Sequence, residues 1–248
     1  MVDSSKTLFV KIGDFFFKYR NIVFPLFLVP FFMFFKPAAI AHTEGELLGP
    51  REIAALMVVF LGLGFRLATI GWAYIKRGGL NKEVYANTLV TEGFFGLCRN
   101  PLYVGNMLIY TGLFVFHGNP LVMIVGTVFY GFIYQSIIAA EEHFLKQKFG
   151  AEYDAYCRSV PRWIPNFNRY KHSIQGMTFQ FNRCLTKDYT TLYNTLFAVI
   201  AVEIIRDFYR DQTLLWQAVW PWLLTLAVLT VALGLVKIYK KRVPQKQS

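Results

Sequence analysis

TLVTEGFFGLCRNPLYVG, residues 88–105, joins a polar loop to the start of an apolar segment. A second polar block, AAEEHFLKQKFGAEYDAY, follows at residues 139–156. Between them lie two apolar segments, 101–117 and 120–140, which are joined only by the turn HGNP at 117–120. Two helices joined by so short a turn lie antiparallel and side by side. The sequence therefore predicts that both polar blocks meet at the same edge of a membrane, where they can enclose a small polar molecule.

The composition of the chain is typical of an integral membrane protein. Of its 248 residues 55% are hydrophobic and 18% are aromatic, and the mean hydropathy is +0.37. Long apolar runs with few charges indicate membrane-spanning helices. We therefore predict an all-α fold, a polytopic membrane helix bundle of about six spans with cytoplasmic loops that form a ligand pocket. The predicted spans are residues 21–38, 53–75, 101–117, 120–140, 191–206 and 215–237.

The distribution of charge gives an orientation. The net charge is +11, which alone would also fit a nucleic-acid-binding protein. Most of the 26 Lys and Arg residues, however, fall before the first predicted span, between the second and third, between the fourth and fifth, and after the sixth. Because cytoplasmic segments of membrane proteins are rich in Lys and Arg, we expect both termini and both polar blocks in the cytoplasm. No nucleic-acid partner is expected.

The chain divides into three parts. Residues 1–20 are amphipathic and are expected to lie in the membrane interface, or else to extend the first span into the cytosol. Residues 21–168 form the predicted membrane core, and residues 169–248 an extension with two further spans. The sequence leaves the role of these two spans open between shielding the core, binding a lipid and forming dimer contacts. The three Cys and four His residues have no spacing typical of a metal site, so we expect no metal.

The first polar block contains residue types that suit a ligand pocket. Gly93 and Gly96 allow close approach of the backbone. Asn100 is placed to cap a helix that begins at Pro101, which would aim the positive end of that helix at the pocket. Flat apolar surface can come from the aromatic residues Phe94, Phe95 and Tyr103.

The two blocks together resemble a known family. The pattern LVT-x-G-x(5)-RNP-x-Y-x-G, then a hairpin, then EE-x(2)-L-x(3)-FG-x(2)-Y-x(2)-Y and a VPR-x-IP end, is similar to the isoprenylcysteine carboxyl methyltransferase and phospholipid methyltransferase superfamily. The resemblance covers roughly residues 86–165. It implies that the core is a membrane methyltransferase that takes a methyl group from S-adenosylmethionine and releases S-adenosylhomocysteine. The acceptor it implies is a lipid or a prenylated small molecule that enters from the bilayer.

The resemblance also implies roles for individual residues. It assigns Glu141 to the cofactor. Arg99 and Asn100 match an Arg-His pair of the eukaryotic enzymes, although Asn100 cannot act as a general base because an amide does not titrate. With Glu142, the nearest candidate base for an amine acceptor, they are the expected catalytic residues. The positions expected to bind the cofactor are Thr88, Leu89, Val90, Thr91, Glu92, Gly93, Phe94, Phe95, Tyr103, Leu108, Ile109, Tyr110, Thr111 and Glu141.

The chain departs from the family pattern at one position. The eukaryotic carboxyl methyltransferases have a substrate-contacting arginine four residues before the cofactor-binding acid, where this chain has Ile137. Arg66 lies in the middle of an apolar span, a place where charged residues usually face a functional cavity. We therefore expect Arg66 to bind the substrate in place of the missing arginine. The alternative is that Arg66 reaches for the interface or pairs with Glu203 inside the bundle.

Three functions are compatible with these residues. The first is an isoprenylcysteine carboxyl O-methyltransferase-like enzyme, whose carboxylate acceptor is already ionised at neutral pH and needs no base. The second is a phospholipid N-methyltransferase of the phosphatidylethanolamine type, whose amine must first lose a proton. The third is a non-catalytic membrane scaffold. A scaffold would have no reason to keep Gly93, Arg99, Tyr103 and Glu141 together.

Overall fold

The structure is a computed structural model that describes residues 6–38, 48–73, 83–211 and 216–242. Part of the basic segment between the second and third predicted spans, and both ends of the chain, lie outside the described residues. Within the described ranges the regular elements are helices, with no β-strand, as the sequence predicts.

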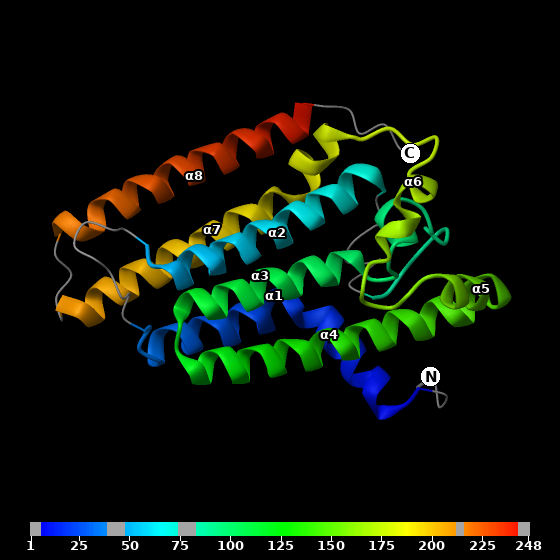
Figure 1. Cartoon of the computed structure of the whole chain (residues 1–248), viewed down its shortest axis with the longest axis horizontal. Helices are drawn as coiled ribbons and strands as arrows, with labels where there is room; N and C mark the ends of the chain where they lie inside the picture. Colours follow the sequence, from blue (N-terminus) through cyan, green and yellow to red (C-terminus); the bar gives the residue numbers. More distant parts are fainter. Residues whose placement is uncertain (1–5, 39–47, 74–82, 212–215, 243–248) are drawn as a thin grey trace.

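Among the residues that the structure describes, six long helices form the bundle, and short helices gather at one of its ends (Figure 1). The long helices are α1 (Leu8–Phe34), α2 (Pro50–Trp72), α3 (Pro101–His117), α4 (Pro120–Phe149), α7 (Phe181–Asp211) and α8 (Trp216–Arg242). The short ones are η1 (Gly93–Gly96), α5 (Ala151–Ser159), η2 (Phe167–Arg169) and α6 (Tyr170–Ser173). The first turn of α1 and the last turn of α8 lie at the same end of the bundle as these short helices (Figure 1).

The prediction of about six spans is not confirmed. Four of the described helices are long and apolar enough to cross a membrane, Leu8–Phe34, Pro50–Trp72, Pro120–Phe149 and Val219–Lys241. Helix α3 has 17 residues, a length of about 26 Å at 1.5 Å per residue, which is short of a hydrocarbon core of roughly 30 Å. Helix α7 carries charged residues toward both of its ends, which shortens its apolar stretch.

Helices α1, α4 and α7 extend at least nine residues beyond the predicted spans at one end. Helix α1 begins at Leu8 and continues past residue 20, so the amphipathic start and the first span form one helix. The side chain of Thr7 caps it by accepting a hydrogen bond from the backbone of Val10. Helix α4 continues nine residues past position 140, because Glu, Lys and Gln are good helix formers in water. Helix α7 begins at Phe181, ten residues before the predicted span.

The turn between α3 and α4 has the predicted form. Helix α3 ends at His117 and is capped by Gly118, whose φ of +79° is a left-handed conformation that favours glycine. The side chain of Asn119 then accepts hydrogen bonds from the backbone N–H groups of Leu121 and Val122. The two helices therefore run antiparallel, and the start of α3 lies beside the end of α4. This arrangement brings the two polar blocks together.

The core packs around α2, α3 and α4. Helices α2 and α3 approach so closely that a Cβ atom on Gly62 would lie 2.7 Å from the carbonyl oxygen of Gly105. Helix α8 lies at the periphery against α7, and only 6% of its most apolar stretch is buried. Fully buried side chains of the core include Val59, Phe114, Tyr130, Ile133, Tyr134 and Ile137.

Candidate functional site

The loop that precedes α3 is a tight turn packed against α2. Gly93 has φ +60° and begins η1. The rings of Phe94 and Phe95 are buried, and Phe94 meets Phe65 of α2 edge to face at 5.0 Å. The two rings form the base on which the turn rests, and their contact with the cofactor stays a prediction.

The start of the same loop is more open. Thr88, Thr91 and Glu92 are exposed, and the partly buried Leu89 packs against α5. The hydroxyl of Tyr156 on α5 donates a hydrogen bond of 2.7 Å to the carbonyl of Phe95. Helix α5 therefore holds the loop against the end of the bundle. Its buried face consists of Tyr153, Tyr156 and, just beyond it, Val160.

Asn100 occupies the N-cap position of α3, but its side chain does not cap the helix. Its backbone carbonyl accepts from the N–H groups of Tyr103 and Val104. The side-chain amide instead donates to the carbonyl of Arg162 at 3.1 Å. The neighbouring Arg99 N–H bonds in the same way to the carbonyl of Pro161 at 2.8 Å. The predicted capping bond is therefore wrong, because residues 160–166 run alongside and take up the Asn100 amide.

Tyr103 and Glu141 connect the two polar blocks. The Tyr103 hydroxyl donates a hydrogen bond of 2.7 Å to Oε1 of Glu141. Arg20 of α1 lies close to both groups. Ile137, one turn before Glu141, is fully buried in the core, so α4 presents no positive charge at that position.

Glu142 is held by two arginines. Arg162 makes a forked contact with its carboxylate, Nε to Oε1 at 3.0 Å and Nη2 to Oε2 at 2.7 Å. Arg99 adds a longer ion pair, Nη1 to Oε1 at 3.4 Å. The remaining Nη1 of Arg162 donates to Gln135 on α4 at 3.2 Å. Forked arginine–carboxylate contacts fix geometry as well as charge, so Arg162 anchors residues 160–166 on α4.

Two buried donors at this cluster have no hydrogen-bond partner among the described residues. They are Nε of Arg99 and Nε1 of Trp163. Arg99 also donates from Nη1 to the sulfur of Cys157 at 2.6 Å. A buried donor without an acceptor is costly, so each such group calls for an explanation. An acceptor group on a bound ligand would supply one.

Of the predicted positions on α3, Tyr110 continues the Tyr103 face of the helix. Tyr110 lies two turns after Tyr103 and stacks on Tyr130 with the ring centroids 4.2 Å apart. Tyr134 lies between them, 5.3 Å from Tyr103 and 6.3 Å from Tyr110. Ile109 is buried toward α2. Leu108 and Thr111 complete the predicted set and are partly exposed.

Arg66 does not join this cluster. Its guanidinium contacts Asp188 of α7 twice, Nε to Oδ2 at 3.0 Å and Nη2 to Oδ1 at 2.5 Å. The other donors reach Asn106, Thr191 and the carbonyl of Leu102. The geometry does not support the predicted substrate role, because its donors are engaged inside the bundle. The alternative pairing with Glu203 is also wrong, since Glu203 pairs with Arg206.

A strap formed by residues 166–180, which was not predicted from the sequence, lies across the turn. The Ser173 hydroxyl donates a hydrogen bond of 2.5 Å to the carbonyl of Gly93. Arg169 Nε donates to the carbonyl of Gly96 at 3.1 Å. The backbone of Asn166 donates to the carbonyl of Leu97 at 3.0 Å. No local sequence pattern indicates these contacts, because they join backbone carbonyls to a polar stretch about 70 to 80 residues away.

One family and several known proteins are similar to part of this chain. The phospholipid methyltransferase family matches residues 50–152. The cobalt-zinc-cadmium resistance protein CzcN of Cupriavidus metallidurans is 33% identical over 121 residues, which cover 48% of this chain and 54% of that protein. Protein-S-isoprenylcysteine O-methyltransferase B of Arabidopsis thaliana is 38% identical over 116 residues, 46% of this chain and 58% of the plant protein.

A second plant enzyme, protein-S-isoprenylcysteine O-methyltransferase A of Arabidopsis thaliana, is 31% identical over 116 residues with the same shares. The chain thus spans little more than half the length of these three relatives. No solved structure matches the chain. Among the described residues, no group of three or more His, Cys, Asp or Glu side chains could hold a metal ion.

Proposed function

We propose that this chain, which matches the phospholipid methyltransferase family over residues 50–152 and is similar to two plant isoprenylcysteine O-methyltransferases, transfers a methyl group from S-adenosylmethionine to an amphiphilic acceptor. The observation that carries the proposal is the polar cluster in which the two blocks meet. Tyr103 of the first block contacts Glu141 of the second, and Glu142 is held between Arg99 and Arg162.

The charges of the cluster suit S-adenosylmethionine. That molecule carries an ammonium group, a positive sulfur and a carboxylate. Glu141 can accept from the ammonium group, and the free Nε of Arg99 can donate to the carboxylate. The loop 88–95, together with Tyr103 and residues 108–111, completes the proposed cofactor site. When bound, the cofactor supplies an electrophilic methyl group on its sulfur, and S-adenosylhomocysteine is the product.

The acceptor that fits best is a carboxylate of the isoprenylcysteine type. Both oxygens of Glu142 already contact arginines, so Glu142 is not free to take a proton from an ammonium group. A carboxylate acceptor needs no base at neutral pH. Arg162 is about one-third exposed and can offer positive charge to it. The protein then acts by holding donor and acceptor in line and by excluding water.

A phospholipid amine is the second candidate acceptor. Two observations favour it: the matching family is named for phospholipid methyltransferases, and the buried Ile137 leaves α4 without the cation that a carboxylate would use there. In that case Glu142 must leave Arg162 before it can act as a base. The lipid would enter laterally through the apolar sides of the helices.

Cofactor binding is tested first. Calorimetry in detergent is expected to show binding of S-adenosylhomocysteine to the wild-type protein. Glu141→Gln should weaken that binding about 10-fold or more, because it removes a charged hydrogen-bond acceptor. Glu152→Gln on the exposed side of α5 is the matched control and should bind like wild type. Absence of binding by the wild-type protein would leave the scaffold hypothesis standing.

The acceptor is tested second. The protein is incubated with methyl-labelled S-adenosylmethionine, a total lipid extract and a farnesylcysteine analogue. Label that appears on the prenylcysteine and is released by mild base identifies a carboxyl ester. Label that remains on a phosphatidylethanolamine derivative after base treatment identifies N-methylation and would reject the carboxyl assignment.

A further inference from the structure

Arg20 lies on the face of α1 that packs against α4. Its guanidinium carbon is 4.5 Å from the centroid of the ring of Phe17, a buried residue. Gly13 approaches α4 so closely that an added Cβ atom would collide with the carbonyl of Ser136. Gly13, Phe17 and Arg20 follow one another at spacings of four and three residues, which places them on one face of the helix. The positive charge of Arg20 is therefore turned toward the bundle.

The same side chain lies next to the contact that joins the two polar blocks. Arg20 is close to the Tyr103 hydroxyl and to the Glu141 carboxylate, which are hydrogen-bonded to each other at 2.7 Å. Among the described residues, however, Arg20 forms no ion pair with an acid. Charged residues that face the interior of a membrane bundle usually serve a functional site. The uncompensated charge of Arg20 favours an anionic ligand at this cluster.

Other arginines of the bundle are less available to such a ligand. Arg66 is neutralised by Asp188 in a forked contact, and Arg162 is engaged by both oxygens of Glu142. Arg20 alone among these three arginines brings its charge to the cluster without an acid in direct contact. It therefore differs from them in what it can bind.

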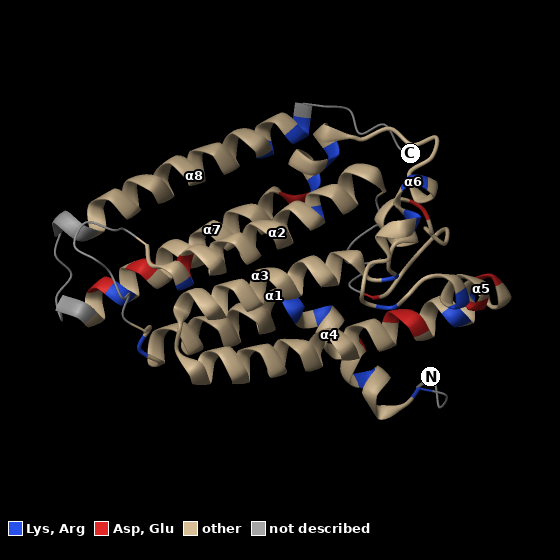
Figure 2. Cartoon of the chain, in the orientation of Figure 1, with Lys and Arg blue, Asp and Glu red and all other residues tan. Residues whose placement is uncertain are grey.

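Arg20 also marks the level at which α1 changes from charged to apolar. Residues 21–34 of this helix carry no charge (Figure 2). Helix α4 changes at the same level, because residues 120–140 are uncharged and Glu141 follows them. Only 11% of the most apolar stretch of α1 is buried, so this helix borders the bilayer. A molecule with a charged head and an apolar chain fits this boundary.

We propose that Arg20 binds the carboxylate of the methyl acceptor, so that the protein prefers an acidic amphiphile to an amine. This assignment rests on the proposed methyl-transfer function. When the ammonium group of the cofactor binds Glu141, Arg20 loses a negative neighbour, and its charge becomes available to the acceptor. The same charge repels a positively charged amine.

The place of Arg20 in the chain favours the acceptor over the cofactor as its ligand. The residues of the proposed cofactor site all lie inside the family match at 50–152, whereas Arg20 lies outside it. The family is named for phospholipids and a relative for isoprenylcysteine, so the acceptors they are named for differ. A residue that selects the acceptor therefore need not lie in the shared region.

Arg20 can hold the acceptor without taking part in a proton transfer. One carboxylate oxygen is bound by the guanidinium, and the other attacks the methyl carbon. The oxygen–carbon bond forms as the carbon–sulfur bond breaks, and the electron pair of the broken bond stays on the sulfur, which becomes neutral. No proton moves in this step.

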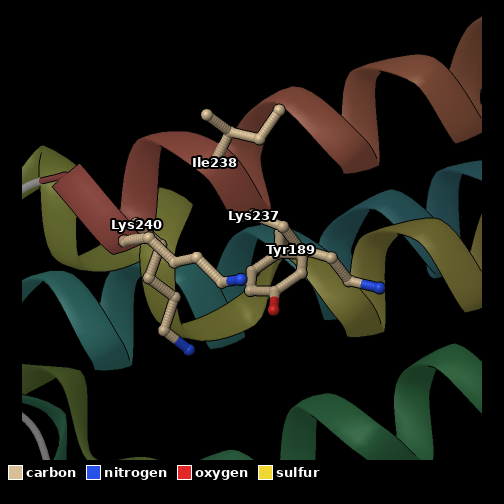
Figure 3. Close-up of a pocket in the computed structure, with 5 residues that line it drawn as sticks. Tyr189, Lys237, Ile238 and Lys240 are labelled. Carbon is tan, nitrogen blue, oxygen red and sulfur yellow. The ribbon is translucent and has the colours of Figure 1, made fainter.

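The test compares two ligands that differ in charge, N-acetyl-S-farnesylcysteine and its carboxamide. Their dissociation constants are measured by calorimetry on the full-length protein in detergent, saturated with S-adenosylhomocysteine. The variants are Arg20→Gln and Arg20→Lys, and the control is Lys240→Gln. Lys240 is also a partly exposed cation over an aromatic ring, 5.5 Å from the centroid of Tyr189, but it lies on α8, which packs against α7 (Figure 3).

Wild type and Lys240→Gln are expected to bind the carboxylate about 10-fold more tightly than the carboxamide. Arg20→Gln should lose this preference and still bind the carboxamide like wild type, which shows that the site is folded. Arg20→Lys should keep part of the preference, because lysine keeps the charge but not the forked contact.

An unchanged preference in Arg20→Gln would overturn the proposal and leave Arg20 as an interfacial anchor of α1. A loss of S-adenosylhomocysteine affinity as large as the loss of preference would assign Arg20 to the cofactor, which also overturns it. If the wild-type protein binds S-adenosylhomocysteine without preferring the carboxylate, the assignment of Arg20 falls and the cofactor site stands. If it does not bind S-adenosylhomocysteine at all, the proposed function is rejected, and the assignment of Arg20 with it.

Discussion

Arg66 of α2 and Asp188 of α7 form a forked ion pair inside the bundle, with side chains only 5% and 1% exposed. Thr191 supports the pair by donating to Oδ1 of Asp188 at 2.8 Å. The two residues are 122 positions apart, and Asp188 lies beyond the family match at 50–152. Because the pair is buried, each residue stabilises the charge of the other. The pair also connects α7 to α2, the helix that packs closely against α3.

Asp188→Asn should therefore destabilise the protein strongly. The substitution leaves the Arg66 charge buried without a counter-ion, which costs about 3–5 kcal/mol. Thermal unfolding in detergent measures the effect. The double variant Arg66→Met/Asp188→Leu removes both charges and should recover most of the loss, because an apolar pair of similar volume avoids the desolvation cost. Unfolding of Asp188→Asn at the wild-type temperature would contradict this account of the pair.

The sequence predicts the positions of the long helices better than it predicts how many of them span the membrane. Apolar runs identify all six long helices, and the turn chemistry of Gly118 and Asn119 gives the ends of α3 and α4 correctly. Hydropathy alone cannot predict that α4 continues to Phe149 or that α7 begins at Phe181. The residues in these extensions are polar, but they still favour a helix. Arg206 pairs with Glu203 within α7, and Asp188 of α7 pairs with Arg66 of α2. These ion pairs, which the sequence does not reveal, allow the charged helix α7 to pack in the bundle.

The candidate site is predicted in part for a related reason. The short hairpin fixes the register between the start of α3 and the end of α4, so it predicts that Tyr103 lies near Glu141. Partners that arrive from distant segments have no comparable signal. Arg162, Ser173 and Asp188 each meet the core through contacts that only the folded chain creates. For the same reason the partner of Arg66 could not be identified from the span that contains it.

The contact between Gly96 and Ser173 predicts a steric rescue. A Cβ atom added to Gly96 would lie 1.9 Å from Oγ and 3.0 Å from Cβ of Ser173. Gly96→Ala should therefore push the strap off the turn and weaken binding of S-adenosylhomocysteine about 10-fold or more. Gly96→Ala/Ser173→Gly removes both clashing atoms and should restore part of the affinity. The restoration should be incomplete, because the hydrogen bond to Gly93 is lost and the carbonyl of Thr91 also lies 3.0 Å away. A double variant no better than Gly96→Ala, measured by calorimetry, would rule out the clash.

Arg162→Lys should separate acceptor handling from cofactor binding. Lysine keeps the charge but cannot make the forked contact with Glu142 while also reaching Gln135. We expect kcat/KM for the acceptor to fall about 10-fold, while the affinity for S-adenosylhomocysteine changes less than about twofold. Arg158→Lys, on the exposed face of α5, is the control and should leave both quantities unchanged. An equal loss in cofactor affinity would place Arg162 in the cofactor site instead.

The Cys98 thiol predicts how the stability of the protein depends on alkaline pH. Cys98 is fully buried beside the loop, and this burial raises its pKa from 9.0 to about 12. Below pH 9 the thiol is protonated in both folded and unfolded states, so Cys98 adds no pH dependence. Between pH 9 and about 12 the unfolded thiol ionises first, and Cys98 should lower the free energy of unfolding by up to about 1.4 kcal/mol per pH unit. Denaturant titrations of wild type and Cys98→Ala measure this difference in slope, and identical pH dependence in the two proteins would show that the thiol is not protected. Alkylation of the native protein at pH 8 should accordingly modify the partly exposed Cys157 well before Cys98.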